Sequence, residues 1–501
     1  MKHGFLKRLA CTALAAVTAL SIAAIPAMAI DSLPDETSAR SLTIYKYSGT
    51  SDYTAGGEGI MQDVDASTHE AIENVVYDIY YYANIGDNVP KSISADDAAT
   101  WAASNASALK ATIITDSTGK ATWNAATGNS ADGVYLVIER ENAALESASA
   151  PFFISLPYTD PDEDSWIYNV VVQPKSAVNP GPEVNKDVTS IDNKDDSDMY
   201  NENQTWIIRG EVPSDLYSSE VINGQTTETY AKNYSFTDVI DSQLTYKGNV
   251  AVKVYVSAET ALAESCYTAT YDESTRTLTV ALTEAGMKAV ATAANGSEDA
   301  EVRVYFDTCI NDTAVVGQDI YNNVELNYTN STGHKYDPSE VPEDDRPEVH
   351  LGGFNILKVD VADTTKTLPG AVYKLAASEA DAKAGTFMTD AEGNEITLTT
   401  DSYGKASYAG LTYPEGGSTE YYLVETQAPD GYQLATAPIK VTVNATTYSD
   451  STKTYTLTDA TKYDLPKAGG HGMMMWIILG MLIIGGTCVT AVATSTRRKT
   501  N

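Results

Sequence analysis

The chain is short of basic residues and of histidine. Its 33 lysines and arginines face 68 aspartates and glutamates, which gives a formal net charge of −35 at pH 7. So acidic a chain repels nucleic acids and anionic membrane surfaces, and this excludes nucleic-acid binding. Away from the two ends, the histidines are His69, His334 and His350, far apart in the sequence. Because no nucleophile-elbow motif or metal-ligand spacing accompanies them, we expect neither a hydrolase nor a bound metal or cofactor.

Both ends of the chain carry targeting signals. At the start, three basic residues precede an apolar stretch over residues 9–25, and Ala27-Met28-Ala29 offers a small-x-small cleavage site. This is the pattern of a secretory signal peptide, so residues 1–29 are expected to be removed during export. At the other end, residues 473–493 form an apolar run long enough to cross a bilayer as a helix. The basic tail 494–501 is expected on the cytoplasmic side.

Cysteine is also scarce. Of the four cysteines, Cys11 lies in the signal peptide and Cys488 in the predicted membrane helix. The exported part of the chain therefore keeps only Cys266 and Cys309. Because an oxidising compartment favours disulfides, we predict a Cys266–Cys309 bridge that contributes about 2–4 kcal/mol, with two buried free thiols as the alternative.

The body of the chain has the pattern of β-structure, with 32 tyrosines against 7 phenylalanines. Apolar residues alternate with polar residues or threonine, at least in part, as expected of strands with one face on a core. The segments concerned are 41–47, 250–257, 276–282 and 440–443. Helix signals are few, and the best are at residues 94–111 and 282–294. The fold class is therefore all-β, with tandem sandwiches whose tyrosine hydroxyls remain in water.

Two connectors divide this body. Residues 174–182 are rich in proline, and residues 337–346 are acidic and contain proline. A body of this length suits about three domains of 100–200 residues. The predicted domains cover residues 30–175, 180–348 and 352–462.

The segment before the apolar C-terminal run is Leu465-Pro466-Lys467-Ala468-Gly469. Together with that run and the basic tail, it resembles the LPxTG sorting signal of Gram-positive surface proteins. The resemblance implies that a sortase cleaves between Ala468 and Gly469 and passes the new carboxyl end to an amine. The family usually has threonine where this chain has Ala468, which points to a specialised sortase. An ordinary single-span membrane protein is the alternative.

Residues 166–175, WIYNVVVQPK, resemble the WxxxVxVxPK pilin motif of sortase-polymerised backbone pilins. The resemblance implies that Lys175 is the amine that accepts the C-terminal carbonyl of the next subunit. Proline lacks an N–H and can end strand pairing, which would present the lysine on a stiff base at a domain junction. The other matching positions are Trp166, Val170, Val172 and Pro174.

A weak internal repeat links the first and last domains. In each, a strand with a lysine is followed by an apolar strand with a tyrosine and then by a Tyr-Leu-Val strand that ends in glutamate. These motifs resemble the collagen-adhesin B-type domains of Gram-positive pilins, and the middle region resembles the A-type domain. The resemblance implies three tandem immunoglobulin-like β-sandwiches with intramolecular isopeptide bonds.

Physical chemistry explains why such a bond needs a buried lysine and a buried acid. A lysine among apolar side chains loses solvation, so its pKa falls and its neutral amine becomes a nucleophile. A buried carboxyl can stay protonated and polarise a nearby carbonyl. Attack on an asparagine expels ammonia, whereas attack on an aspartate expels water. The alternative is a solvated ion pair worth at most about 1 kcal/mol.

In the last domain, the resemblance assigns the bond to Lys358 and Asp459, with Glu425 as the promoting acid. Asp459 lies on the strand a few residues before the sorting signal, where the family has its acceptor. Asn444 is the alternative acceptor.

In the middle domain, the resemblance assigns the bond to Lys186 and Asn322, promoted by Asp238. Strand alternation points the neighbouring Asn323 to the opposite face.

In the first domain, the corresponding set is incomplete. Lys46 and Glu139 are present, but Ser176 stands where some relatives have an asparagine. Serine has no side-chain carbonyl, so no isopeptide bond is expected there.

Taken together, these motifs predict a major fimbrial subunit with no enzymatic activity, in a fibre on the surface of a Gram-positive bacterium. Ala468 of one subunit would be joined to Lys175 of another, which gives an open head-to-tail polymer. The implied partners are identical subunits, a pilus-specific class C sortase, a housekeeping sortase, peptidoglycan and a minor tip pilin. The alternative is a monomeric wall-anchored adhesin for host or dietary ligands, which would have no use for Lys175.

Overall fold

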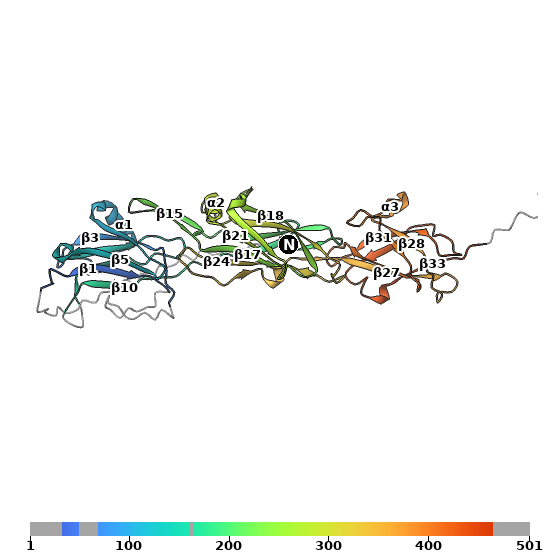
Figure 1. Cartoon of the computed structure of the whole chain (residues 1–501), viewed down its shortest axis with the longest axis horizontal. Helices are drawn as coiled ribbons and strands as arrows, with labels where there is room; N and C mark the ends of the chain where they lie inside the picture. The colour runs from blue at the N-terminus through green and yellow to red at the C-terminus, as the bar shows by residue number, and fades with distance from the viewer. Residues whose placement is uncertain (1–32, 50–68, 160–164, 464–501) are drawn as a thin grey trace, which may run out of the picture. The chain divides into compact units, whose positions relative to one another are not determined.

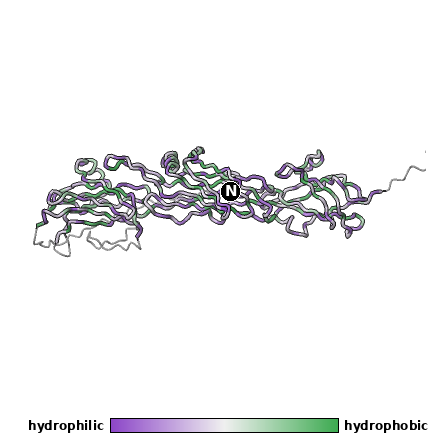
Figure 2. Tube along the Cα trace, viewed as in Figure 1, coloured by the Kyte–Doolittle hydropathy of each residue, from purple (hydrophilic) through white to green (hydrophobic). Residues whose placement is uncertain are grey.

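The computed structural model describes residues 33–49, 69–159 and 165–463. It divides into two compact units. Among the described residues, the first unit contains 33–49, 69–159, 165–352 and 410–418, and the second contains 353–409 and 419–463. Strands make up most of the regular structure in both units (Figure 1). Hydrophobic and hydrophilic residues alternate along many of these strands, as Figure 2 shows, and this alternation gives each sheet one face toward a core.

The first unit begins with a sandwich of two main sheets, ordered β10-β1-β5 and β4-β3-β6-β7. Leu42 and Ile44 point from β1 into its core, which they share with Tyr77 and Ile79 of β3. Helix α1 (Ala95–Ser104) begins at the N-cap Ser94, whose side chain accepts a hydrogen bond from the Asp97 amide. The strands are β1 Ala39–Tyr45, β2 Tyr47–Ser48, β3 Val76–Ala83, β4 Leu109–Ile114, β5 Lys120–Thr127, β6 Gly133–Glu139, β7 Phe152–Leu156, β8 Tyr158–Thr159, β9 Trp166–Ile167, β10 Asn169–Val172 and β11 Lys175–Ser176.

A second sandwich in the same unit has two five-stranded sheets, ordered β12-β14-β22-β18-β19 and β20-β21-β17-β24-β25. Trp206, Phe236 and Phe306 fill its core. Helix α2 (Glu284–Ala294) has Thr283 as its N-cap. The strands are β12 Val184–Val188, β13 Asp195–Ser197, β14 Asn203–Glu211, β15 Tyr217–Ile222, β16 Gln225–Tyr230, β17 Asn233–Val239, β18 Leu244–Tyr255, β19 Glu259–Ala261, β20 Tyr267–Asp272, β21 Thr277–Leu282, β22 Glu301–Ile310, β23 Ile320–Tyr321, β24 Glu325–Thr329, β25 Ser339–Glu340 and β26 Glu348–His350.

The second unit contains sheets ordered β30-β27-β33 and β29-β28-β31-β32. The first and last strands of this sandwich, β27 and β33, lie side by side and run parallel, with Lys358 opposite Leu457. The elements are β27 Gly352–Asp360, β28 Val372–Ala376, α3 Glu379–Ala384, β29 Thr397–Thr399, β30 Lys405–Leu411, β31 Thr419–Gln427, β32 Ile439–Val443 and β33 Tyr455–Asp459. Gly352 at the start of β27, and Gly410 and Leu411 at the end of β30, group with the first unit.

The all-β prediction is confirmed, and each of the four predicted strand segments overlaps a strand. The predicted helix at residues 94–111 is shorter than expected, because α1 ends at Ser104 and β4 begins at Leu109. The predicted connectors contain paired structure. Lys175 and Ser176 form β11 against β2, and β25, inside residues 337–346, pairs with β24.

The predicted signal peptide (1–29), sorting signal (465–469), membrane helix (473–493) and basic tail (494–501) lie outside the described residues. Within the described ranges, no helix is long and apolar enough to cross a membrane.

The structure corrects the predicted disulfide, because Cys266 and Cys309 are both free thiols. Cys309 is buried on β22, a central strand of one five-stranded sheet, and its Sγ lies 3.9 Å from the Asn201 side-chain oxygen. Cys266 ends a short 3-10 helix before β20, an edge strand of the other sheet. Packed sheets lie roughly 10 Å apart, whereas a disulfide needs its Cα atoms about 4.4–6.8 Å apart.

The two thiols should therefore differ in reactivity. Cys266 is half-buried and Cys309 fully buried, so a thiol reagent should label Cys266 first in the native protein. After denaturation without reductant, mass spectrometry should find both labelled. Failure to label either one until a reductant is added would restore the disulfide.

Candidate functional site

Three lysines, one in each sandwich, are fully buried, and each meets a carboxylate. In the middle sandwich this lysine is Lys186 on β12, whose Nζ donates a short hydrogen bond to Asp238 of β17. Nζ also lies 5.0 Å from the centre of the Trp206 ring and 5.3 Å from that of Phe306. Lys186 and Asp238 belong to opposite sheets, so their contact bridges the interior.

Burial moves both pKa values toward the neutral pair. It lowers the pKa of Lys186 to about 8, although the Asp238 carboxylate opposes this shift. It raises the pKa of Asp238, against the opposing effects of Lys186 and the Asn322 carboxamide. A neutral amine beside a protonated carboxyl is the pair that nucleophilic attack requires.

Asn322 lies between β23 and β24, where the chain enters the closing strands of the sandwich. Its side chain is buried, and neither its Oδ1 nor its Nδ2 has a hydrogen-bond partner of good geometry. The Lys186 Nζ lies 3.2 Å from the backbone oxygen of Asn323, the residue that follows Asn322. The Asn323 side chain turns the other way, to Glu340. The structure thus brings Lys186, Asp238 and Asn322 together, as the sequence predicts.

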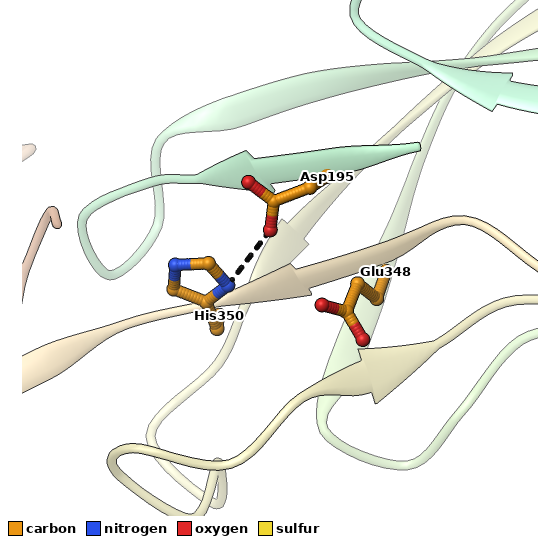
Figure 3. Close-up of side chains that lie close together, drawn as sticks. All are labelled: Asp195, Glu348 and His350. Atoms are coloured by element: carbon orange, nitrogen blue, oxygen red, sulfur yellow. Dashed lines mark ion pairs between the residues drawn. The ribbon is translucent and has the colours of Figure 1, made fainter. Parts of the chain in front are cut away.

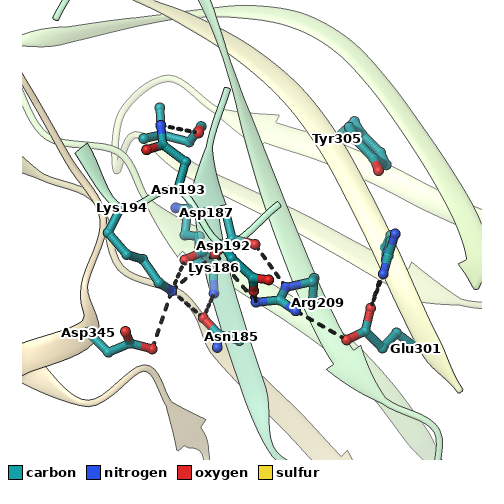
Figure 4. Close-up of polar contacts among 12 residues, drawn as sticks. Asn185, Lys186, Asp187, Asp192, Asn193, Lys194, Arg209, Glu301, Tyr305 and Asp345 are labelled. Atoms are coloured by element: carbon teal, nitrogen blue, oxygen red, sulfur yellow. Dashed lines mark hydrogen bonds and ion pairs between the residues drawn. The ribbon is translucent and has the colours of Figure 1, made fainter. Parts of the chain in front are cut away.

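An ionic network on the outer side of β12 fixes the strand that carries Lys186 (Figure 4). Asp187, the next residue, is buried and pairs with Arg209 of β14 at 2.8 Å and with Lys194 at 3.1 Å. Arg209 also pairs with Asp192 at 2.9 Å. Because β12 is an edge strand, these side-chain pairs add to the backbone hydrogen bonds that it makes on one side only.

In the second unit, the Lys358 Nζ lies 2.5 Å from Asp459 Oδ1 and 2.9 Å from Glu425 Oε1. The three side chains are nearly inaccessible to solvent, with exposures of 1%, 3% and 0%. Glu425 is held by the Tyr373 hydroxyl at 3.0 Å and the Ala435 amide at 2.7 Å. Burial raises the pKa of Asp459, and the adjacent lysine opposes this effect. The carboxyl groups of Asp459 and Glu425 both lie within hydrogen-bonding distance of the Lys358 amine.

The alternative acceptor Asn444 lies elsewhere. Asn444 directly follows Val443, the last residue of β32, and Val443 pairs with Thr419 at the start of β31. Glu425 lies six residues further along β31. At about 3.3 Å per residue, that separation is roughly 20 Å. The Asn444 side chain instead caps its own turn by accepting from Thr446. The geometry therefore favours Asp459.

The first sandwich repeats this arrangement with a serine as its third member. The Lys46 Nζ donates to Glu139 Oε2 and to the Ser176 hydroxyl, both at 2.7 Å. The Tyr77 hydroxyl donates to the same glutamate oxygen at 2.9 Å. Burial lowers the pKa of Lys46, with Glu139 opposing the shift. Tyr77 and Tyr373 thus hold equivalent glutamates, although the sequence motif gave these tyrosines no role beyond the strand pattern.

The pilin-motif residues surround the start of β11. Val170 is buried on β10, and Pro174 follows that strand, which ends at Val172. Strand pairing resumes at once, since Lys175 lies opposite Tyr47 of β2. Lys175 is half-buried, which lowers its pKa.

The sequence did not connect His69 with Lys175, because the two residues are 106 positions apart. In the structure, the Lys175 Nζ lies 2.9 Å from Nε2 of His69. A hydrogen bond between two nitrogens needs one donor and one acceptor, so this contact ties the position of the lysine amine to the histidine ring.

Comparisons with known families agree with this architecture. Residues 37–177 match the family described as Gram-positive pilin subunit D1, N-terminal domain, and residues 352–459 match the SpaA family, a prealbumin-like fold domain. These matches, together with the curated relative below, support the class of Gram-positive pilins, which are structural subunits rather than enzymes.

The chain is also similar to individual proteins. The chain is 26% identical over 440 residues to the fimbrial subunit type 1 of Actinomyces viscosus, covering 78% of this chain and 79% of that protein. It is similar to a C-terminal fragment of the major pilin GBS80 of Streptococcus agalactiae, with 26% identity and a TM-score of 0.47 over 56% of this chain and 100% of the fragment. It is also similar to the major pilin SpaD of Corynebacterium diphtheriae, with 19% identity and a TM-score of 0.42 over 86% and 99% of the two chains.

Restoring a carboxamide at the third position of the first sandwich should allow a bond there. The Ser176→Asn variant should lose one additional ammonia, because its carboxamide would stand where the serine hydroxyl meets Lys46. Intact-mass spectrometry would detect the loss, and adding Glu139→Ala should abolish it. The control Ser176→Ala should show no mass loss and a free energy of unfolding lower by about 1–3 kcal/mol, because it removes one of the hydrogen bonds of the buried Lys46 amine and leaves the contact with Glu139. An unchanged mass in a folded Ser176→Asn protein would contradict the expectation.

Proposed function

We propose that this chain is the backbone subunit of a covalent pilus, polymerised by a class C sortase that joins Ala468 of one subunit to Lys175 of the next. The sortase thiol attacks the Ala468 carbonyl, and the peptide bond to Gly469 breaks and releases an amine. The Lys175 amine then attacks the thioester and releases the thiol. One amide replaces another, so no external energy source is required.

The placement of Lys175 carries this proposal. The lysine lies on a short paired strand at the end of a domain that matches the pilin D1 family, and its amine contacts His69. A lowered pKa increases the fraction of neutral amine, which is the form that can attack a thioester.

The proposal includes two intramolecular isopeptide bonds. Lys186 attacks the side-chain carbonyl of Asn322 and expels ammonia, and Lys358 attacks that of Asp459 and expels water. Asp238 and Glu425 act as proton donors that polarise the two carbonyls. The support is the burial and close approach of each set. In the middle sandwich, desolvation also lowers the pKa of Lys186 and raises that of Asp238.

The same proposal covers the two ends of the chain and its final location. Residues 1–29 would direct export, and residues 473–493 would hold the precursor in the membrane until the sortase cleaves it. A housekeeping sortase would then link the finished fibre to peptidoglycan, and a minor tip pilin would end it.

Polymerisation should depend on one lysine. In cells that express Lys175→Ala, the SDS-resistant ladder of cell-wall extracts should disappear, because the acyl-enzyme has no amine to accept its substrate. Monomer should still reach the surface. The matched control Lys120→Ala changes an exposed lysine of the same sandwich and should keep the ladder. A normal ladder from Lys175→Ala would refute the assignment.

The two bonds should be visible as a mass deficit. A reduced recombinant chain covering residues 30–464 should weigh less than its sequence by one ammonia and one water. Asp238→Ala should restore the ammonia and Glu425→Ala the water, whereas Glu420→Ala, an exposed site on the same strand as Glu425, should restore neither. A wild-type mass equal to the sequence mass would contradict both bonds, and a deficit of two ammonias would indicate Asn444 instead of Asp459.

A further inference from the structure

A small sheet in the first unit gathers carboxylates around a buried histidine. The sheet has the order β13-β26-β23, and its register places Asp195 and Tyr321 on either side of Glu348. His350 follows Glu348 by two residues, so both side chains project from the same face of β26 (Figure 3). One donor atom each from Asp195, Glu348 and His350 lies within 4.8 Å of the others.

The hydrogen bonding of His350 leaves one ring nitrogen available. The residue is completely buried, and its Nε2 lies 2.9 Å from the backbone oxygen of Tyr413. Because a carbonyl can only accept, Nε2 carries a hydrogen and donates it. In a neutral ring, Nδ1 is then an unprotonated acceptor. It has no hydrogen bond of good geometry, although it lies 3.1 Å from Asp195 Oδ2 and 3.9 Å from Asp319 Oδ1.

The negative charge at this site exceeds what one histidine can balance. Glu348 is buried, Asp195 is partly buried, and Asp319 approaches the same ring nitrogen of His350. Asp195 Oδ2 is also buried without a hydrogen bond. Three carboxyl groups, those of Asp195, Glu348 and Asp319, thus lie near a histidine nitrogen that has no hydrogen bond of good geometry.

We propose that Asp195, Glu348 and His350 bind a divalent transition-metal ion of the zinc class. Imidazole together with carboxylate oxygens is a donor set suited to Zn²⁺, whereas Ca²⁺ prefers oxygen ligands alone. Metal-bound histidines usually donate their other N–H to a carbonyl or carboxylate, as Nε2 does here to Tyr413. Asp319 or water takes the fourth position. Zinc bonds of about 2.0–2.2 Å require the three side chains to draw together slightly.

Such an ion would connect separate parts of the first unit. Asp195 comes from β13, Glu348 and His350 from β26, and Tyr413 from residues 410–418, which group with this unit although they are remote in sequence. The Tyr413 ring packs against the imidazole at 4.3 Å between centroids. The ion would hold this segment through the His350 ring and stabilise the folded state by binding it alone. This role is independent of sortase chemistry and of the isopeptide bonds.

The test uses the full chain, purified in detergent, treated with a chelator and titrated with Zn²⁺ by calorimetry. We expect one ion per chain and a rise in Tm of several degrees. The Glu348→Gln and His350→Gln variants should bind at least tenfold more weakly, whereas the controls Glu340→Gln and His334→Gln should match the wild type. Absence of binding, or binding unchanged in the first two variants, would overturn the proposal.

A second measurement covers the case in which a variant fails to fold. With Co²⁺ in place of Zn²⁺, the wild-type protein should show visible d–d absorption typical of a low-coordinate site. In nitrogen NMR spectra, Zn²⁺ should shift the His350 Nδ1 resonance. A resonance showing Nδ1 protonated both with and without Zn²⁺ would establish an Asp195–His350 ion pair instead and refute the metal site.

Discussion

The three sandwiches share one constraint, a lysine buried where water cannot solvate its charge. An unpaired charge in such a place costs several kcal/mol, so each lysine must be neutral or must face an acid. Lys46, Lys186 and Lys358 each lie on or next to the opening strand of their sandwich and meet an acid from another strand. A group from the closing part of the sandwich completes each set. The lysine therefore draws the beginning, middle and end of each domain to one point.

The three sites differ in the chemistry of their third residue. This difference matches the route along which force would pass through the proposed fibre. Asn322 and Asp459 have side-chain carbonyls, whereas Ser176 does not. In the proposed polymer, tension enters at Lys175 and leaves at Ala468. Almost all of the first sandwich precedes Lys175 and is not in series with the load. The two sandwiches that would carry this tension are the two that contain a proposed acceptor.

Strand periodicity in the sequence predicted the all-β class, and the resemblance to collagen-adhesin domains named the members of each buried set, because both depend on local sequence patterns. The sequence did not predict contacts that depend on how distant strands pack. His69 meets Lys175, Tyr77 and Tyr373 hold the glutamates, and Glu348 and His350 meet Asp195 across a strand pair. The disulfide prediction failed for the same reason, since compartment and cysteine count do not reveal which sheet carries each thiol. The segments predicted as connectors contain short paired strands. The sequence did not reveal them, because proline and charged residues are also common in edge strands.

The proposed isopeptide bonds would bear load across the second and third sandwiches. Single-molecule pulling of one subunit between Lys175 and the residues before the sorting signal tests this most directly. The wild type should extend without releasing the segments between Lys186 and Asn322 or between Lys358 and Asp459. The variant that carries both Asp238→Ala and Glu425→Ala should release them, with about 3.3–3.6 Å of extension per residue freed. Full unfolding of both sandwiches in the wild type, at the lengths seen for the double variant, would contradict the account.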